Sequence, residues 1–222
     1  MWRAYFFGCI LRMNAQRSNK FLSSSKRNKR MKVYGDAISG NCQKVAFTAD
    51  YLGIDYEWVD IDILAGDSRT AEFLALSPAG QVPVVQLPDG RTLAQSNAII
   101  AYLARDSKLL PVDSFQRAKV DEALFWEQYS HEPYVAVCRF QMLYQKKSAA
   151  EREAWRVERA DAALDQMNAH LQSQQWYVTD QLTIADIALL AYTRLAPEGG
   201  LALEPRPHVM RWIKDCEQTL GI

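Results

Sequence analysis

The chain has 222 residues, of which 49% are hydrophobic and 23% are charged, a composition typical of a globular protein with one or two small domains. The formal net charge is zero, but residues 1–30 hold eight Lys or Arg and no acid, so residues 31–222 carry 18 basic and 26 acidic side chains, a net charge of −8. This acidic body argues against nucleic-acid binding, and no apolar run approaches the roughly 20 residues that span a membrane.

The first 30 residues differ from the rest of the chain. They are rich in Arg and Ser and free of acids, as in a transit peptide. Arg3 interrupts their apolar stretch, and no small-residue cleavage site follows it, which argues against a secretory signal. An upstream-extended start, with Met31 beginning the fold, is the alternative that we favour. In either case we expect this leader to be disordered in isolation.

The segment 31–106 predicts an α/β unit with the order βαβαββα. Val45, Ala49 and Leu52 share one face of its first helix, which Gly53 ends, and the Pro-Asp-Gly turn at residues 88–90 predicts a hairpin. The predicted elements are a strand at 32–35, a helix at 42–52, a strand at 56–63, a short helix at 71–76, hairpin strands at 82–87 and 91–94, and a helix that begins at Ser96.

Residues 107–113 read as a linker, and 114–222 predict an all-helical domain. Thr183 and Asp186 have the spacing of a capping box, so a helix should begin there. The other predicted helices are one at 115–144 with a kink near Pro133, one at 149–174 and one at 207–220. An α/β domain followed by an all-α domain places a small-molecule site at the seam between them.

Four cysteines, Cys9, Cys42, Cys138 and Cys216, show neither metal-binding nor disulfide spacing. This pattern favours a reduced, cytoplasmic protein that contains no metal site.

Four motifs carry a resemblance to a known family. SGNCQKV, GQVPVV, QSNAI and LTIADIAL occur in this order between residues 39 and 189. From residue 31 onward the chain resembles a cytosolic glutathione S-transferase, of the theta-like bacterial group with a serine-type active site. The resemblance implies a thioredoxin-like N-terminal domain, glutathione as co-substrate, no metal and a homodimer.

Ser39 matches the family position of the catalytic hydroxyl, just before the first helix. A thiol of pKa ~8.5 is only slightly ionised at neutral pH, and lowering this pKa by about two units requires about 2.7 kcal/mol of preference for the anion. A hydrogen bond to a charged sulfur supplies roughly 1.5–3 kcal/mol and a helix N-terminus roughly 0.3–1 kcal/mol more, so the two are sufficient. The alternative is that Ser39 only caps the helix.

Two neighbours of Ser39 are alternative candidates for a role at the glutathione sulfur. Asn41 can donate an amide hydrogen to the thiolate or to the peptide. Cys42 stands where a thioredoxin-like Cys-x-x-Cys has its second cysteine, but Ser39 replaces the first, which excludes a dithiol cycle through this motif.

The resemblance also implies where glutathione is held. Val82-Pro83 matches the cis-proline element that pairs with the cysteinyl backbone, and Ser96 matches the residue that holds the γ-glutamyl carboxylate at a helix N-terminus. Gln95 stands where many members have an acid, and an uncharged amide can only form hydrogen bonds there. Gln81 is a weaker candidate for the glycyl end.

Aromatic residues on the predicted helix at 115–144 are the candidates for a second-substrate pocket. Phe125, Tyr129 and Tyr144 recur at helical spacing, which is also the pattern of an ordinary core. We expect them to line an apolar pocket that faces Ser39.

The function expected from this resemblance is a detoxifying glutathione transferase, which forms thioethers from small, mostly apolar electrophiles. One alternative is a non-catalytic ligand carrier or docking module of the same fold. Another is a glutathione-dependent reductase or an isomerase of the zeta type, although the Ser39-Gly40-Asn41 start departs from the Ser-Ser-Cys start of that type. The sequence leaves the electrophile open, because apolar pockets discriminate weakly.

Overall fold

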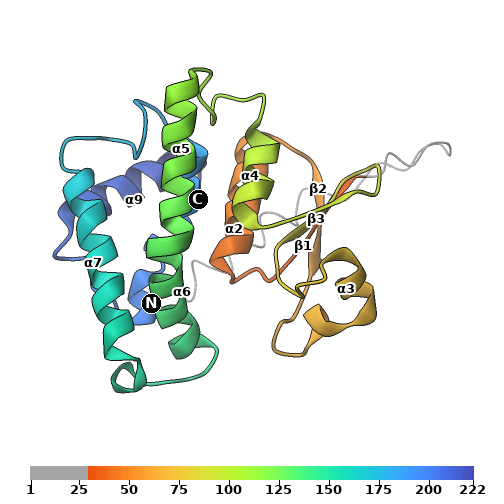
Figure 1. The fold of residues 1–222 in the computed structure, drawn as a ribbon, viewed down its shortest axis with the longest axis horizontal. Helices are drawn as coiled ribbons and strands as arrows, with labels where there is room; N and C mark the ends of the chain where they lie inside the picture. Colours follow the sequence, from red (N-terminus) through yellow and green to blue (C-terminus); the bar gives the residue numbers. More distant parts are fainter. Residues whose placement is uncertain (1–29) are drawn as a thin grey trace.

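The computed structural model describes residues 30–222. The predicted leader lies outside the described residues except for Arg30, which forms an ion pair with Asp55 at 2.9 Å. The described chain folds as a mixed sheet with its helices, joined to a bundle of helices (Figure 1).

The sheet has the strand order β2-β1-β3-β4 over the described residues. β1 is parallel to β2 and antiparallel to β3, and β3 and β4 form the predicted hairpin. The strands are β1 (Met31–Gly35), β2 (Tyr56–Asp60), β3 (Val84–Gln86) and β4 (Thr92–Ala94). β2 ends three residues earlier than predicted, because the Asp62 carboxylate accepts hydrogen bonds from the N–H groups of Leu64 and Ala65 and closes a turn there.

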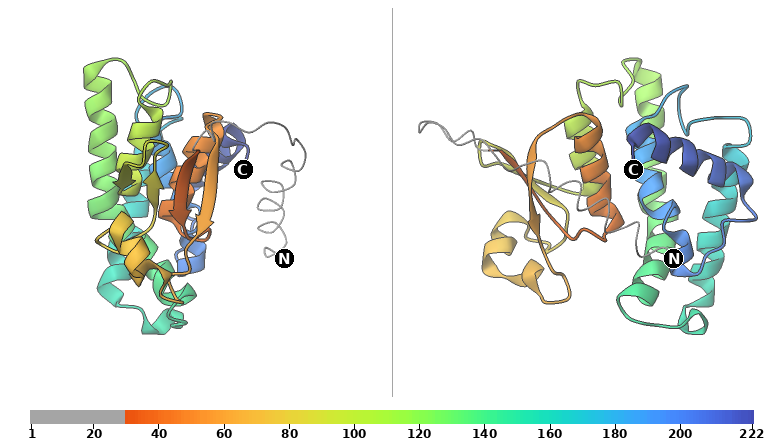
Figure 2. Two further views of the ribbon diagram at one scale, coloured as in Figure 1. Left: turned by 90° about the vertical axis from the view of Figure 1, so that its right-hand side faces the viewer. Right: turned by 180° about the vertical axis from the view of Figure 1, so that it is seen from behind.

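Helices cover both faces of the sheet. The α/β domain contains α2 (Gly40–Tyr51), η1 (Asp67–Arg69), α3 (Ala71–Leu76) and α4 (Ser96–Ala104). α2 and α4 lie between the sheet and the helical bundle, and α3 lies on the far side of the sheet (Figures 1 and 2). The N-terminus of α2 therefore opens at the seam between the two domains.

The helical domain follows without a strand through residue 222 of the described chain. Its elements are α5 (Ser114–Trp126), η2 (Glu127–His131), α6 (Glu132–Leu143), η3 (Ala149–Glu151), α7 (Ala154–His170), α8 (Ile184–Thr193), η4 (Ala196–Gly199) and α9 (Pro207–Leu220). α9 has the predicted bounds. The predicted capping box of α8 is confirmed, with reciprocal bonds between Thr183 and Asp186.

Two predicted helices differ in the structure. The helix at 115–144 is divided into α5, η2 and α6: η2, a π-helical turn, lies just before Pro133, which sits in the first turn of α6. Proline lacks an N–H and crowds the carbonyl four residues back, and a wider turn relieves both problems. The helix at 149–174 is shorter than predicted, because the short η3 turn at its start is separated from α7 by extended backbone at Arg152 and Glu153.

One hydrophobic core spans both domains, so the seam is filled with side chains. It joins Val33 and Val45 of the α/β domain to Leu164 and Leu189 of the bundle. α8 lies at its centre, where every residue from Ile184 to Thr193 is buried, and it packs against α2. This packing fixes the N-terminal end of α2 relative to the bundle.

Candidate active site

Ser39 stands at the N-cap position of α2. The chain leaves β1 and turns at Asp36, whose carbonyl accepts the N–H of Ser39 at 3.0 Å and whose carboxylate accepts the N–H of Ile38 at 3.0 Å. Ser39 has extended backbone, φ −72° and ψ 123°, and within the described chain its side chain makes no capping hydrogen bond. The Ser39 hydroxyl is therefore not used as a cap, and it stands at a helix end whose partial positive charge attracts anions.

The helical domain holds the turn that precedes Ser39. The guanidinium of Arg139, 4% exposed, donates to the carbonyl of Ile38 at 2.8 Å and pairs with Glu198 at 2.7 Å. The hydroxyl of Tyr144 donates to the carboxylate of Asp36 at 2.9 Å. Burial and the nearby Asp36 raise the pKa of Tyr144 above its ordinary value, so this hydroxyl remains a donor.

Tyr144 is thus the one predicted pocket residue that the structure brings to the loop before Ser39. Its ring stacks on that of Phe140, with centroids 4.9 Å apart. Phe125 and Tyr129 are placed elsewhere: they are 76% and 81% exposed. Their expected contribution to a pocket facing Ser39 is wrong, because the helix turns the buried Glu127 toward α2 and so directs Phe125 and Tyr129 away from it.

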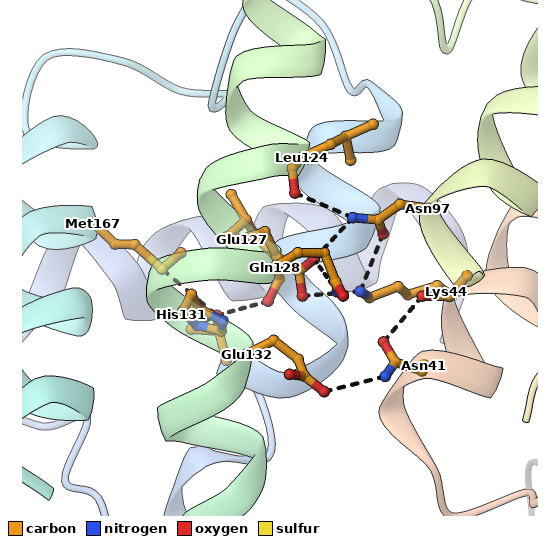
Figure 3. A network of polar contacts seen from close by, with 12 residues as sticks. Asn41, Lys44, Asn97, Leu124, Glu127, Gln128, His131, Glu132 and Met167 are labelled. Atoms are coloured by element: carbon orange, nitrogen blue, oxygen red, sulfur yellow. Dashed lines mark hydrogen bonds and ion pairs between the residues drawn. The ribbon is translucent and has the colours of Figure 1, made fainter. Parts of the chain in front are cut away.

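Asn41 and Ser96 lie together at the seam, as Figure 3 shows for Asn41 and its partner Glu132. The Ser96 hydroxyl donates to the Asn41 side chain at 3.0 Å, and the Asn41 amide donates to the Glu132 carboxylate at 3.3 Å. Burial raises the pKa of Glu132. The N-termini of α2 and α4 therefore meet at one place, with polar side chains between them.

The remaining predicted glutathione contacts lie on the strand and turn beside these helix ends. The Val82–Pro83 bond is cis, as the resemblance implies, and it leads into β3, which pairs with β1. Gln81 is exposed, and its carbonyl accepts from the Ser77 hydroxyl at 3.4 Å. Gln95 is exposed and has φ 70°, a conformation that costs a non-glycine residue roughly 1–3 kcal/mol and is retained mostly at functional sites.

Cys42 is fully buried in α2. Burial raises the pKa of its thiol to about 12, against a smaller opposing effect of the Ser39 side chain. The thiol is therefore protonated at neutral pH, and it packs as a small apolar group rather than acting as a redox thiolate.

A buried ion pair ties α2 to the helical domain below the site (Figure 3). The ammonium group of Lys44 lies 2.9 Å from Glu127, and both side chains are 0% exposed. Asn97 accepts from Lys44 at 3.2 Å and donates to Glu127 at 2.9 Å. Each charge thus has a charged and an amide partner, which a buried ion needs in order to be tolerated.

The sequence suggested only a structural or subunit-contact role for Arg139 and none for Tyr192, and it did not predict that both reach the segment around Ser39. Tyr192 is a buried residue of α8, and its ring lies against Gly40. One signal was available for Tyr192: a glycine in the first turn of a helix is unfavourable unless another group approaches the backbone closely. Nothing in the local pattern marks Arg139, whose partners lie on distant segments.

Within residues 30–222 no group of three or more His, Cys, Asp or Glu side chains could hold a metal ion. Across the same residues, none of the helices has the length and apolar character to cross a membrane. The described cysteines, Cys42, Cys138 and Cys216, are free and buried.

Comparisons with known proteins agree along most of the chain. Family models for the glutathione S-transferase N-terminal domain and C-terminal domain match residues 38–106 and 124–219. Glutathione S-transferase 3 of Zea mays is 33% identical over 195 residues, which cover 82% of this chain and 86% of that protein.

Two bacterial crystal structures are similar in fold and in sequence. A glutathione S-transferase from Pseudomonas fluorescens matches with a TM-score of 0.81 and 44% identity, covering 84% of this chain and 94% of that one. One from Xanthobacter autotrophicus matches with a TM-score of 0.82 and 42% identity, covering 86% and 95%.

Proposed function

Because the chain belongs to the cytosolic glutathione S-transferase family and is a glutathione transferase, we propose that it activates glutathione at the N-terminus of α2, with Ser39 as the catalytic residue. The observation that carries this proposal is the Ser39 hydroxyl, which stands at a helix N-terminus without capping it. A thiolate placed there receives a hydroxyl hydrogen bond and the partial positive charge of α2.

The reaction follows from that charge. The glutathione thiol releases its proton to solvent, and the thiolate attacks an electrophilic carbon of the second substrate. A carbon–sulfur bond forms. In a substitution, the leaving group departs with the bonding pair. In an addition to a double bond, the carbanion that results takes a proton from solvent. Because a bound thiolate is present before the electrophile arrives, the site needs no general base.

The rest of the tripeptide is held by two helix ends and one strand. We assign the γ-glutamyl carboxylate to Ser96 and the N-terminus of α4, where N–H groups attract an anion. Gln95 hydrogen-bonds the same end, and Asn41 lies within 3.0 Å of the Ser96 hydroxyl. Val82, before the cis Pro83, pairs with the cysteinyl backbone, and Gln81 is placed at the glycyl end.

The second substrate is a small electrophile that enters beside Tyr144. The stacked rings of Phe140 and Tyr144 offer an apolar wall near the Asp36 turn, which supports a mostly apolar substrate. We also propose that the enzyme is a cytoplasmic homodimer. The exposed rings of Phe125 and Tyr129 support a partner surface on that side of the helix, since large exposed aromatics are common at interfaces.

The test is an ultraviolet difference titration of glutathione bound to wild type and to Ser39→Ala. In wild type we expect the bound thiol pKa near 6.5, about two units below the free value of ~8.5, and in Ser39→Ala we expect it to return most of the way. Ser39→Thr, which keeps a hydroxyl, should retain part of the shift. Thr70→Ala is the matched control, because Thr70 caps α3 through its own side chain and lies outside the site. An equal thiol pKa in wild type and Ser39→Ala would remove Ser39 from the mechanism.

A further inference from the structure

Two side chains of α6 reach the segment that ends at Ser39. The Tyr144 hydroxyl donates to the Asp36 carboxylate at 2.9 Å, and the Arg139 guanidinium donates to the carbonyl of Ile38 at 2.8 Å. These partners are 108 and 101 positions apart in the sequence, so both contacts join the helical domain to the α/β domain. The carbonyl carbon of Ile38 is bonded directly to the nitrogen of Ser39, which makes Arg139 the nearer of the two supports.

The guanidinium of Arg139 is fixed on two sides. The side chain is 4% exposed, and its Nε donates to the Glu198 carboxylate at 2.7 Å while its Nη1 donates to Ile38. The backbone of Arg139 is also closely packed, because a Cβ added to Gly199 would lie 2.8 Å from its nitrogen. A guanidinium serves both partners because its donors form a rigid planar fork, which the compact ammonium of lysine lacks.

The peptide that Arg139 holds decides where the Ser39 hydroxyl lies. The N–H of Ser39 donates to the carbonyl of Asp36 at 3.0 Å, and its own carbonyl accepts the N–H of Gln43 at 3.0 Å. Only one side-chain torsion separates this backbone from the hydroxyl oxygen, so a shift of the peptide moves the hydroxyl by a similar distance. A misplacement of about 1 Å, even one caused by a residue far from the chemistry, can lower a rate about 100-fold.

We propose that Arg139 is a positioning residue, which fixes the peptide before Ser39 and so places the Ser39 hydroxyl against the glutathione sulfur. The inference rests on the proposed function, because it needs glutathione bound at Ser39. Glu198 balances the charge of Arg139, so the guanidinium acts through its hydrogen bond to Ile38 rather than as a second positive charge on the sulfur. The helical domain thereby controls the precision of a site that stands on the α/β domain.

The experiment measures the bound thiol pKa by ultraviolet difference titration in wild type and in Arg139→Lys, which keeps the charge and loses the fork. We expect the pKa to rise by about 1 unit, roughly half the effect of Ser39→Ala, and kcat/KM to fall about 10-fold at a pH below both pKa values. The affinity for S-methylglutathione, which has no thiol, should stay at its wild-type value. In a Ser39→Ala background, Arg139→Lys should leave the thiol pKa unchanged.

Arg206→Lys is the matched control. Arg206 is also a buried arginine, 6% exposed, and it pairs with Asp161 and Asp165 of α7. It also donates to a backbone carbonyl, that of Ala202. Its partner helix α7 lies on the side of the bundle away from the sheet (Figure 1). Loss of this fork should lower the free energy of unfolding and leave the thiol pKa at its wild-type value.

Glu198→Gln separates position from charge. If Arg139 acted through its charge, removing the counter-charge would lower the thiol pKa. If Arg139 acts through position, the weaker bond to a neutral partner loosens the guanidinium, and the thiol pKa should rise by about 0.2–0.5 unit. The Glu198 side chain is 41% exposed, so this variant tests the inference even where Arg139→Lys fails to fold.

The outcomes separate this inference from the function it rests on. A thiol pKa that Ser39→Ala raises and Arg139→Lys leaves unchanged overturns the role of Arg139 alone. A lower thiol pKa in Glu198→Gln also overturns it, as does an effect of Arg139→Lys that persists without the Ser39 hydroxyl, because the guanidinium then acts on the sulfur directly. A loss of S-methylglutathione affinity as large as the loss of kcat/KM would reduce Arg139 to a structural role. If the thiol pKa of wild type is not lowered at all, the proposed function itself fails.

Discussion

The helices α2 and α8 both begin with a hydroxyl residue at the N-cap, and they use it in opposite ways. The Thr183 hydroxyl accepts the N–H of Ala185 and bonds the Asp186 carboxylate, which in turn accepts the N–H of Thr183 at 2.9 Å. Ser39 makes no such bond to α2 within residues 30–222. Next to it, the ring of Tyr192, a residue of α8 itself, lies against Gly40.

The difference shows how one fold separates stability from chemistry. At the start of α8, buried in the core, side chains of the helix accept hydrogen bonds from its own backbone N–H groups. At the start of α2, the side-chain cap, which would be worth ~1 kcal/mol, is absent, and the helix end is left for a ligand. α2 is held in place instead by its middle, through the ion pair of Lys44 with Glu127 and through core packing. Substitutions should therefore change stability at the α8 end and activity at the α2 end.

Asp186→Ala should have the largest effect. The carboxylate accepts from the Thr183 N–H and hydroxyl, the Tyr177 N–H at 2.8 Å and the Trp212 indole at 2.9 Å, and all of these donors would lose their partner. We expect the free energy of unfolding in urea to fall by about 3–5 kcal/mol. Thr183→Ala should lose less, about 0.5–2 kcal/mol. A loss below about 1 kcal/mol for Asp186→Ala would contradict a structural role for this N-terminus.

Acidification should weaken the same region through His131. Burial lowers the pKa of His131 to about 4, and the ring bonds Thr193 at the end of α8 at 2.9 Å. The unfolded chain binds a proton near pH 6.5, so between pH 6.5 and about 4 it holds more protons than the folded chain, and stability falls as pH falls. The full loss is about 3 kcal/mol.

This pH effect is measured as the free energy of unfolding at pH 7 and at pH 4.5, in wild type and in His131→Gln. The variant should show a flatter dependence between these values, because it lacks the group that takes up the proton on unfolding. The same slope in both proteins would assign the acid sensitivity to other groups.

Ser39→Ala should lower the activity and leave the stability nearly unchanged. Losing a hydrogen bond of about 1.5–3 kcal/mol to a charged sulfur lowers kcat/KM about 10- to 150-fold near neutral pH. Because the hydroxyl does not cap α2, the free energy of unfolding should change by less than about 0.5 kcal/mol. A stability loss of more than about 1 kcal/mol would show that Ser39 acts as an ordinary cap.

Gly40→Ala should give the smallest effect. It tests the contact between the N-terminus of α2 and α8. Alanine favours a helix by about 1 kcal/mol over glycine, but the added methyl group would overlap the Tyr192 ring, at a cost of about 1–3 kcal/mol. The net loss of stability should be about 0–2 kcal/mol. Ala46→Gly, elsewhere on α2, should lose about 1 kcal/mol. A more stable Gly40→Ala protein would contradict the close approach of α8.

Some features were predictable because their causes are close in sequence. The capping box of Thr183 and Asp186 and the hairpin of β3 and β4 depend on residues a few positions apart, and both are confirmed. In both cases short-range hydrogen bonding and turn chemistry are sufficient. Ser96 was expected to cap α4, but the N-cap is Gln95 and Ser96 is the first helical residue.

Other features depend on contacts across the chain. Helical spacing alone does not say which face of α5 and η2 is buried, and the aromatic pair Phe125 and Tyr129 was wrongly expected beside Ser39. The deciding partner, Lys44, is 83 positions from Glu127. The π-helical turn η2 adds to the difficulty, because its wider turn changes the face on which every later residue of α6 lies.

The sequence by itself determined that Ser39 and Thr183 stand at helix starts and which family chemistry the chain resembles. Only the tertiary structure decided which hydroxyl is a cap and which is left for a ligand. Thr183 finds its partner in Asp186, three residues away, and so bonds locally. The Ser39 hydroxyl has no such local partner, and the ring of Tyr192 reaches the neighbouring Gly40 only when α8 packs against α2.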